Sequence, residues 1–230
     1  MHTHNYHYSR ILKPLKMAVV LACLCIQSSC TIYSTKAITG KIVDAETGEP
    51  LSGVNVVAQW RIDRKMVGDE KSLLKIMETV SNKDGNYDFP AWGPVVLPPL
   101  ANFGQGSDPL IYYFKHGYWP GNAQNDTVLD TSSRTPPLGE FKWNGKTIKL
   151  KKWDGQDVEN YGIWIRGISH LTDDWIKNER KAYRSYPRML NTLIEEASYF
   201  EKIGAKEEFF VCVPCFEAEK LEFLNRFKQK

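Results

Sequence analysis

The chain is poor in cysteine and has no long apolar run. Five cysteines among 230 residues are too few for a small domain held together by disulfides. The longest apolar run, residues 17–26, is too short to span a ~30 Å hydrocarbon core, which needs about 20 apolar residues. The remaining composition, 42% hydrophobic and 25% charged, is globular and excludes collagenous, coiled-coil and largely disordered chains.

A broad basic field is also missing. The net charge of +3 comes from Arg10, Lys13 and Lys16, because residues 1–29 hold no acid and the remainder is formally neutral. A neutral chain does not attract a polyanion over its whole surface, so we expect no nucleic-acid partner.

Motifs for catalysis and metal binding are absent. The chain has neither an H-x-x-E zinc pattern nor a G-x-S-x-G elbow nor a phosphate-binding glycine loop. His170 and Asp173 form only H-x-x-D, and we expect Asp173 to lie in the first turn of a helix. We therefore predict a protein without enzymatic activity, metal or cofactor.

The N-terminus has the pattern of an export signal. A basic segment precedes the apolar run 17–26, and Ser28 and Ser29 then lead to Cys30. This order resembles a bacterial lipobox, with Gln27 standing where the family usually has Leu. The resemblance implies removal of residues 1–29, a lipid anchor on Cys30 and an outer-membrane or periplasmic location. Ordinary signal cleavage near Cys30, giving a soluble exported protein, remains the alternative.

Short strands and turns recur between residues 37 and 153. Segments 38–44, 53–60 and 147–151 place apolar residues on one face, as half-buried strands do. Segment 110–118 is predicted to be another strand that ends near a glycine. Val54, Val56, Ala58 and Trp60 fall on one face. Residues 79–89 predict a hairpin with Asp84-Gly85 at its turn.

An ordered set of motifs along these strands is similar to the carboxypeptidase regulatory-like domain. The set comprises Gly40-x-Ile-Val-Asp44, Thr47-Gly-x-Pro-Leu51, Gly53-Val-x-Val56, Asp84-Gly-x-Tyr-x-Phe89, Lys115-x-Gly-Tyr118 and Ile148-x-Leu150. The resemblance covers about half the chain and implies a transthyretin-like β-sandwich of seven strands. It also implies a non-catalytic module of an exported protein. Segments 61–78 and 90–109 depart from the pattern, and we expect two long loops there.

A helical extension is expected over residues 172–230, after a connector at 154–171. Thr172 can cap a first helix, and Pro187 predicts a kink or a new helix. Apolar residues at helical spacing then continue to Ile203, and Gly204 ends the helix. A last helix from Pro214 to about 227 would turn Phe216, Leu224 and Phe227 inward. The expected fold is mainly β, with two or three α-helices packed on the sandwich.

The pair Cys212 and Cys215 forms a C-x-x-C motif. A cysteine at a helix N-terminus can serve thiol–disulfide exchange. The βαβ context of such redox sites is missing, and in an oxidising compartment the same spacing suits a local disulfide. A structural disulfide or free thiols and a redox site therefore both remain open.

Seven tryptophans offer the other candidate site. Trp60 belongs to the predicted core, whereas Trp92, Trp119 and Trp143 lie in or beside predicted loops. Exposed indoles can contact a protein partner or stack on sugar rings, and buried ones would only pack. We therefore expect an envelope protein that binds or supports others, with an envelope protein or a glycan as its partner.

Overall fold

The computed structural model describes residues 32–64, 70–97, 101–102, 109–125, 139–169, 182–205 and 218–228. The strands are β1 (Ile32–Thr35), β2 (Ile38–Asp44), β3 (Asn55–Arg64), β4 (Glu70–Val80), β5 (Asn86–Phe89), β6 (Trp92–Val96), β7 (Ala101–Asn102), β8 (Leu110–Phe114), β9 (Gly121–Ala123) and β10 (Thr147–Leu150). The helices are α2 (Val158–Ser169), the 3₁₀ turn η1 (Ala182–Ser185), α3 (Pro187–Lys202) and α4 (Ala218–Lys228).

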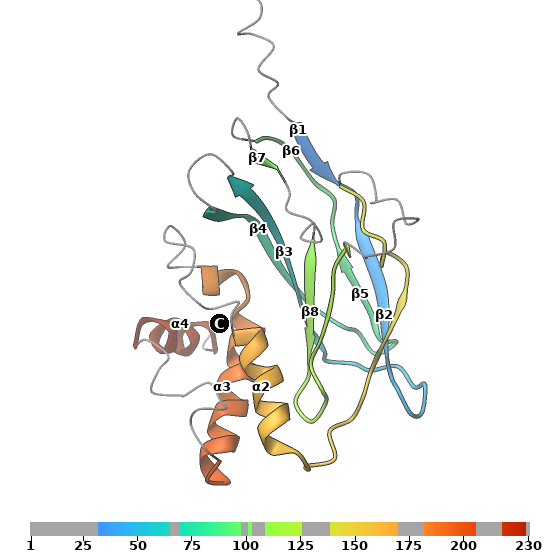
Figure 1. Ribbon diagram of the computed structural model, residues 1–230. Coiled ribbons are helices and arrows are strands. Elements are labelled where there is room, and N and C mark those ends of the chain that lie inside the picture. The colour runs from blue at the N-terminus through green and yellow to red at the C-terminus, as the bar shows by residue number, and fades with distance from the viewer. Residues whose placement is uncertain are drawn as a thin grey trace, which may run out of the picture.

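Two sheets face each other as a β-sandwich (Figure 1). One sheet has the order β10-β2-β5, with β10 parallel and β5 antiparallel to β2. The other has the order β4-β3-β8-β9, with β7 paired to the end of β3. A separate ribbon joins β1 to β6. The prediction of a mainly β fold with a helical C-terminal extension is confirmed.

The main core lies between the sheets. Its centre is the inner face of β3, where Val56, Ala58 and Trp60 are all fully buried. Tyr87 and Phe89 of β5 pack against them from the opposite sheet. The alternation read from the sequence therefore identified the buried face of β3 correctly, and Trp60 is a core residue.

The helices cover the outer face of the β3–β4 sheet (Figure 1). Val57, on the outer face of β3, belongs to a second buried cluster with Leu190 and Leu193 of α3. Burying each such side chain contributes roughly 1.5–3 kcal/mol. Residues 55–60 of β3 are thus buried on both faces, and the extension packs on the sandwich as expected.

Helix α3 begins and ends where the sequence indicated. Pro187 occupies its first turn, where the missing N–H has no intrahelical partner to lose. Gly204 follows the C-cap with a positive φ of 68°. Thr172, expected to open an earlier helix, lies outside the described residues, as do Pro214 and Phe216.

Helix α2 lies in the segment expected to be only a connector. Tyr161, Ile165 and Ile168 recur at helical spacing and are buried against the sheet. Gly162 and Gly167 lower helix propensity, but tertiary packing outweighs it. The inward position expected for Phe227 is wrong, because 39% of its surface is exposed, whereas Leu224 is buried.

The hairpin expected at 79–89 is wrong. Strand β4 pairs with β3, whereas β5 pairs with β2 in the other sheet. The turn is fixed to β2, because Ile42 donates its N–H to the Gly85 carbonyl at 2.9 Å. A Cβ on Gly85 would lie 2.4 Å from the Ile42 oxygen. This close approach directs the chain across the sandwich instead of back along β4.

The two expected long loops are partly strands. Segment 61–78 extends β3 and β4 into a longer antiparallel pair, with cross-strand partners continuing to Arg64 and Glu70. Segment 90–109 contains β6 and β7. Pro94 is tolerated in β6 because the two-stranded ribbon leaves one side of that strand unpaired. Among the helices that the structure describes, none is both long and apolar enough to cross a bilayer.

Candidate functional site

The three predicted cysteine positions lie outside the described residues. Cys30 precedes β1, and Cys212 and Cys215 fall between α3 and α4. Their roles therefore remain predictions. In the described part of the chain, no group of three or more His, Cys, Asp or Glu side chains is placed to hold a metal ion.

Trp92 lies in β6 and packs beneath the β1–β6 ribbon. Its ring meets Trp60 edge-on at 5.2 Å and Tyr33 at 5.3 Å between ring centroids. It is half-buried, and its enclosed Nε1 has no hydrogen-bond partner among the residues that the structure describes. Trp92 therefore continues the main core, and the structure does not bring it together with Trp119 and Trp143.

Trp119 and Trp143 line one groove of about 450 Å³. The other lining residues are Pro120, Gly121, Asn122, Thr147, Ile148, Lys149, Leu150 and Lys151. The groove follows the seam of the sandwich, where the last strand of one sheet, β9, lies beside the last strand of the other, β10. Both indoles are half-buried, so each presents part of its ring to the groove.

The backbone at one end of the seam holds Trp119 in place. Its N–H donates to the Lys151 carbonyl at 2.8 Å, and Tyr118 pairs with Lys152 in an isolated antiparallel β-bridge. The Trp119 ring rests perpendicular to buried Tyr161, with centroids 5.4 Å apart. Helix α2 thus supports the wall of the groove, which gives this helix a role that the sequence analysis missed.

Trp143 lies on a short turn before β10. Its Nε1 donates to the Gln124 carbonyl at 3.0 Å, just after β9. The turn is closed by the Lys146 N–H, which donates to the Trp143 carbonyl at 3.1 Å. The indole therefore links the two edge strands from the end opposite Trp119.

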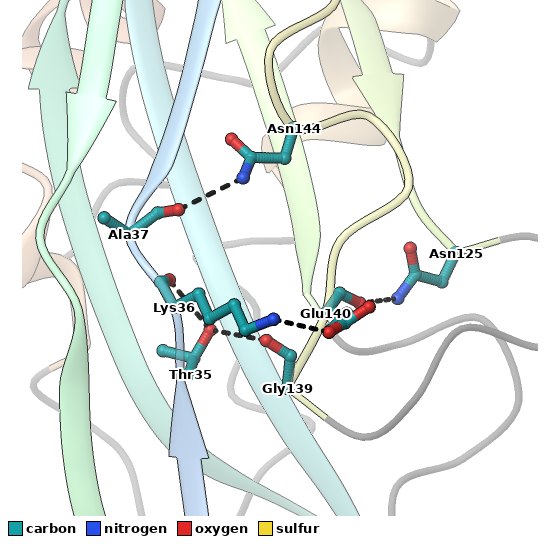
Figure 2. A network of polar contacts seen from close by, with 7 residues as sticks. All are labelled: Thr35, Lys36, Ala37, Asn125, Gly139, Glu140 and Asn144. Carbon is teal, nitrogen blue, oxygen red and sulfur yellow. Dashed lines mark hydrogen bonds and ion pairs between the residues drawn. The ribbon is translucent and has the colours of Figure 1, made fainter.

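A polar network holds the segment that carries Trp143 against the end of β1 and the link from β1 to β2 (Figure 2). Thr35 donates its hydroxyl to the Gly139 carbonyl at 3.3 Å, and the Lys36 ammonium meets Glu140 at 2.6 Å. Asn125 donates to the Glu140 carbonyl at 2.7 Å. Asn144 donates its side-chain amide to the Ala37 carbonyl at 3.3 Å. Binding residues on a loop fixed in this way lose little freedom when a ligand arrives.

The floor of the groove is narrow and apolar. Strands β9 and β10 lie close together at Gly121, since a Cβ on this residue would make an ordinary van der Waals contact with Leu150 Cδ2 at 3.4 Å. Leu150 is buried in the main core and Ile148 packs against it. A larger residue at position 121 would therefore fill the groove at the point where the two strands lie side by side.

A second polar cluster lies at the junction of α3 and the β8–β9 loop. The His116 Nδ1 contacts the Glu196 carboxylate, which is fully buried although the imidazole is largely exposed. Burial and the nearby Glu196 both raise the pKa of Tyr161. No sequence spacing connects these residues, so sequence reasoning could not have found the cluster. It joins α3 to the sandwich, and the paired imidazole fixes the β8–β9 loop that ends in Trp119.

Another hollow, of about 580 Å³, lies between β3, β4 and the ends of α3 and α4. Asn55 and Thr192 in its wall are bonded to each other, with the amide donating to the hydroxyl at 2.8 Å. Arg188 and Lys228 lie at its rim. Of its described lining residues only Phe227 is aromatic, so the seam groove is the better candidate for ligand binding.

No protein-family model and no curated protein matches the sequence. Among solved structures, a streptococcal ancillary pilin is 14% identical, with a TM-score of 0.29 over 53% of this chain and 30% of the pilin. The 3-chlorocatechol 1,2-dioxygenase from Rhodococcus opacus is also 14% identical, with a TM-score of 0.32 over 52% of this chain and 61% of the enzyme.

The C-terminal domain of the shaft pilin SpaA from Lactobacillus rhamnosus GG is 14% identical, with a TM-score of 0.23 over 53% of this chain and 98% of that domain. This chain spans less than two thirds of the length of both the ancillary pilin and the dioxygenase. At TM-scores this low the likenesses carry no argument about function. The β-sandwich is defined by the chain's own sheets.

Proposed function

We propose that this chain is an exported, non-catalytic protein of the bacterial cell envelope, anchored by lipid on Cys30. Its sandwich, a module of the carboxypeptidase regulatory-like type, acts as a binding module for a carbohydrate chain. The location is the outer membrane or the periplasm.

The observation that carries the binding role is the placement of Trp119 and Trp143. They come from separate segments of the chain, yet both line the groove between β9 and β10. Each is fixed by a hydrogen bond to the opposite edge, at 2.8 Å from the Trp119 N–H and 3.0 Å from the Trp143 Nε1. Two pre-positioned aromatic rings over an apolar floor suit the faces of sugar rings, which are apolar on one side.

The start of the fold supports the anchor. Strand β1 begins at Ile32, two residues after Cys30, so acyl chains on Cys30 would place the β1–β6 ribbon at the membrane surface. Ile32 and its cross-strand partner Val96 are each 66% exposed. Exposed apolar side chains next to a lipidated residue add contact with the headgroup region.

Glycan binding is tested on an array of bacterial and plant oligosaccharides with the mature chain carrying Cys30→Ser. We expect binding that Trp119→Ala and Trp143→Ala each weaken by about tenfold, as for an aromatic residue central to a binding site. Trp164→Ala is the matched control, because Trp164 is 47% exposed on α2 and does not line the groove. Absence of any glycan signal from the folded chain would refute the binding role.

The anchor is tested by intact mass and detergent phase partitioning after expression of the full chain in a bacterial host. We expect a diacylglyceryl mass increment that Cys30→Ser abolishes. Cys23→Ser, within the apolar run, is the control and should leave the increment unchanged. An unmodified chain cut near residue 30 would contradict the anchor and favour a soluble exported binder.

A further inference from the structure

Lysines gather along one side of the seam groove. Residues 141–153 contain five of them, Lys142, Lys146, Lys149, Lys151 and Lys152, and no acid. Lys149 and Lys151 themselves line the groove. The Lys142 ammonium lies 5.8 Å from the centre of the Trp143 ring. A chain that is formally neutral beyond residue 29 thus concentrates positive charge at its candidate binding groove.

Four of these five lysines have no acidic partner among the described residues. Lys146, Lys149, Lys151 and Lys152 form no ion pair within the part of the chain that the structure describes. Two acids flank the segment: Glu140 is already paired with Lys36 at 2.6 Å, and the Asp154 carboxylate accepts the Gln156 N–H at 2.9 Å. Unpaired like charges side by side repel one another, and an anionic ligand relieves that repulsion.

We propose that the groove binds an acidic polysaccharide, one whose sugars carry carboxylates, rather than a neutral glycan. This inference rests on the proposed function and names the class of its ligand. Trp119 and Trp143 would contact the sugar faces. Lys149 and Lys151 are two residues apart on an extended chain, so their backbone positions repeat at about 7 Å along the groove. A polymer with regularly spaced carboxylates complements such a row.

A peptide strand added between the sheets fits the seam less well. The Trp119 N–H is already bonded to the Lys151 carbonyl at 2.8 Å. Further along, a Cβ on Gly121 would already be in van der Waals contact with Leu150 Cδ2, at 3.4 Å. The two edges therefore leave no width for an inserted strand unless they separate. An anionic bilayer fits less well too, because the indoles line a concave groove and are half-buried.

The test uses the mature Cys30→Ser chain and isothermal titration with a galacturonate hexasaccharide, a neutral cellohexaose of equal length, polyaspartate and phosphatidylglycerol vesicles. We expect the galacturonate to bind at least about tenfold more tightly than the neutral sugar and to weaken with added salt. Lys149→Ala with Lys151→Ala should weaken its binding by roughly three- to tenfold. Lys83→Ala with Lys202→Ala, both exposed outside the groove, is the matched control.

The other possible results distinguish the proposed sugar binding from the proposed preference for acidic sugars. Tryptophan-dependent binding of both sugars with equal affinity would overturn the acidic specificity and leave the proposed function standing. Binding of polyaspartate or vesicles as tightly as galacturonate, unaffected by Trp119→Ala, would show a general polyanion surface and overturn the inference. Binding of no sugar would overturn both. Trp143→Phe keeps a ring in the wall and guards against misfolding, since it should bind better than Trp143→Ala.

Discussion

The N-terminus of α3 is capped by a residue from the sheet, which makes Glu78 a sensitive point for stability. Tyr186, at the N-cap position, forms no side-chain cap. Instead, the Glu78 carboxylate on β4 accepts the N–H of Arg188 at 3.2 Å and that of Met189 at 2.7 Å. The carboxylate therefore joins the helix to the strand it covers, and removing it should weaken both.

The expected cost depends on what replaces the carboxylate. Glu78→Ala leaves two N–H groups without an acceptor, and losing a helix cap costs about 1 kcal/mol while a buried unsatisfied group costs about 1–3 kcal/mol. We expect a loss of about 2 kcal/mol in the free energy of unfolding. Glu78→Gln keeps one carbonyl oxygen for the shorter bond, so its cost should stay below about 1 kcal/mol.

The pH dependence separates charge from hydrogen bonding. Burial raises the pKa of Glu78 above its usual 4.5, although both backbone N–H groups oppose that shift. Because the pKa of Glu78 is higher in the folded than in the unfolded chain, its protonated form stabilises the fold fully below pH 4.5. This contribution to the free energy of unfolding is lost as pH rises through the folded pKa. Wild type should therefore gain stability relative to Glu78→Gln in acid and lose it toward neutral pH.

Urea unfolding followed by tryptophan fluorescence, at neutral pH and below pH 4.5, measures these differences. Glu195→Ala is the control on the same helix. The Glu195 side chain is exposed, and among the described residues its carboxylate accepts only from Asn191, at 2.6 Å, so the change should stay within about 0.5 kcal/mol. Equal losses for Glu78→Ala and Glu78→Gln, or a pH trend of opposite sign, would refute the reasoning.

Three further measurements probe the core and the turns. Leu193→Ala removes a fully buried contact between α3 and the sheet, and urea unfolding should show a loss of about 2–5 kcal/mol. Burial raises the pKa of the Tyr87 and Tyr113 phenols, which share a hydrogen bond of 2.9 Å. The neutral phenols stabilise the fold fully below pH 10, and this contribution is lost as pH rises through their raised folded pKa. Ultraviolet titration should therefore show both tyrosines ionising only when circular dichroism reports unfolding. Ionisation of these tyrosines in the folded chain near pH 10 would contradict the prediction. The backbone N–H groups of Thr47 and Glu46 lower the pKa of Asp44 below 3.8. The stabilisation from its carboxylate is therefore present above pH 3.8 and lost as pH falls through the lowered folded pKa. Asp44→Asn should remove this pH dependence of the free energy of unfolding in acid, and an unchanged pH dependence would contradict the assignment.

Sequence patterns predicted the features of the fold that depend on neighbouring residues in the chain. The alternation along β3 identified its core face, because successive side chains of a strand point to opposite sides. Pro187 and Gly204 fixed the ends of α3, because each restricts or frees the backbone at its own position.

Elements that depend on distant partners could not be predicted from local patterns. The turn at Asp84-Gly85 has the composition of a hairpin, yet the bond from Ile42 to Gly85 sends β5 to the opposite sheet. Helix α2 has two glycines that reduce its propensity, and the sheet beneath Tyr161 and Ile165 stabilises it instead. Both features arise from contacts between segments far apart in the chain.

The candidate site was partly visible in the sequence. Trp119 and Trp143 could be selected because they flank predicted strands, but their meeting in one groove depends on β9 and β10 ending their respective sheets. Trp92 could be selected for the same reason and lies against Trp60 instead. Equivalent sequence positions thus lead to a groove wall in one case and to core packing in another, because strand order decides between them.

The lysines in and around β10 also have a simpler explanation, although only Lys149 lies within the strand itself. Charged residues on an unpaired edge strand discourage edge-to-edge aggregation, and Lys149 on β10 is placed to do so. That role needs only charge and would be served equally by lysines on the free edge of β9, which has none. The lysines instead lie before, within and after β10, and Lys142, next to Trp143 in sequence, lies 5.8 Å from the centre of its ring. Charge gathered beside an aromatic wall is what recognition of an anionic sugar requires, whereas protection of an edge needs no aromatic wall at all.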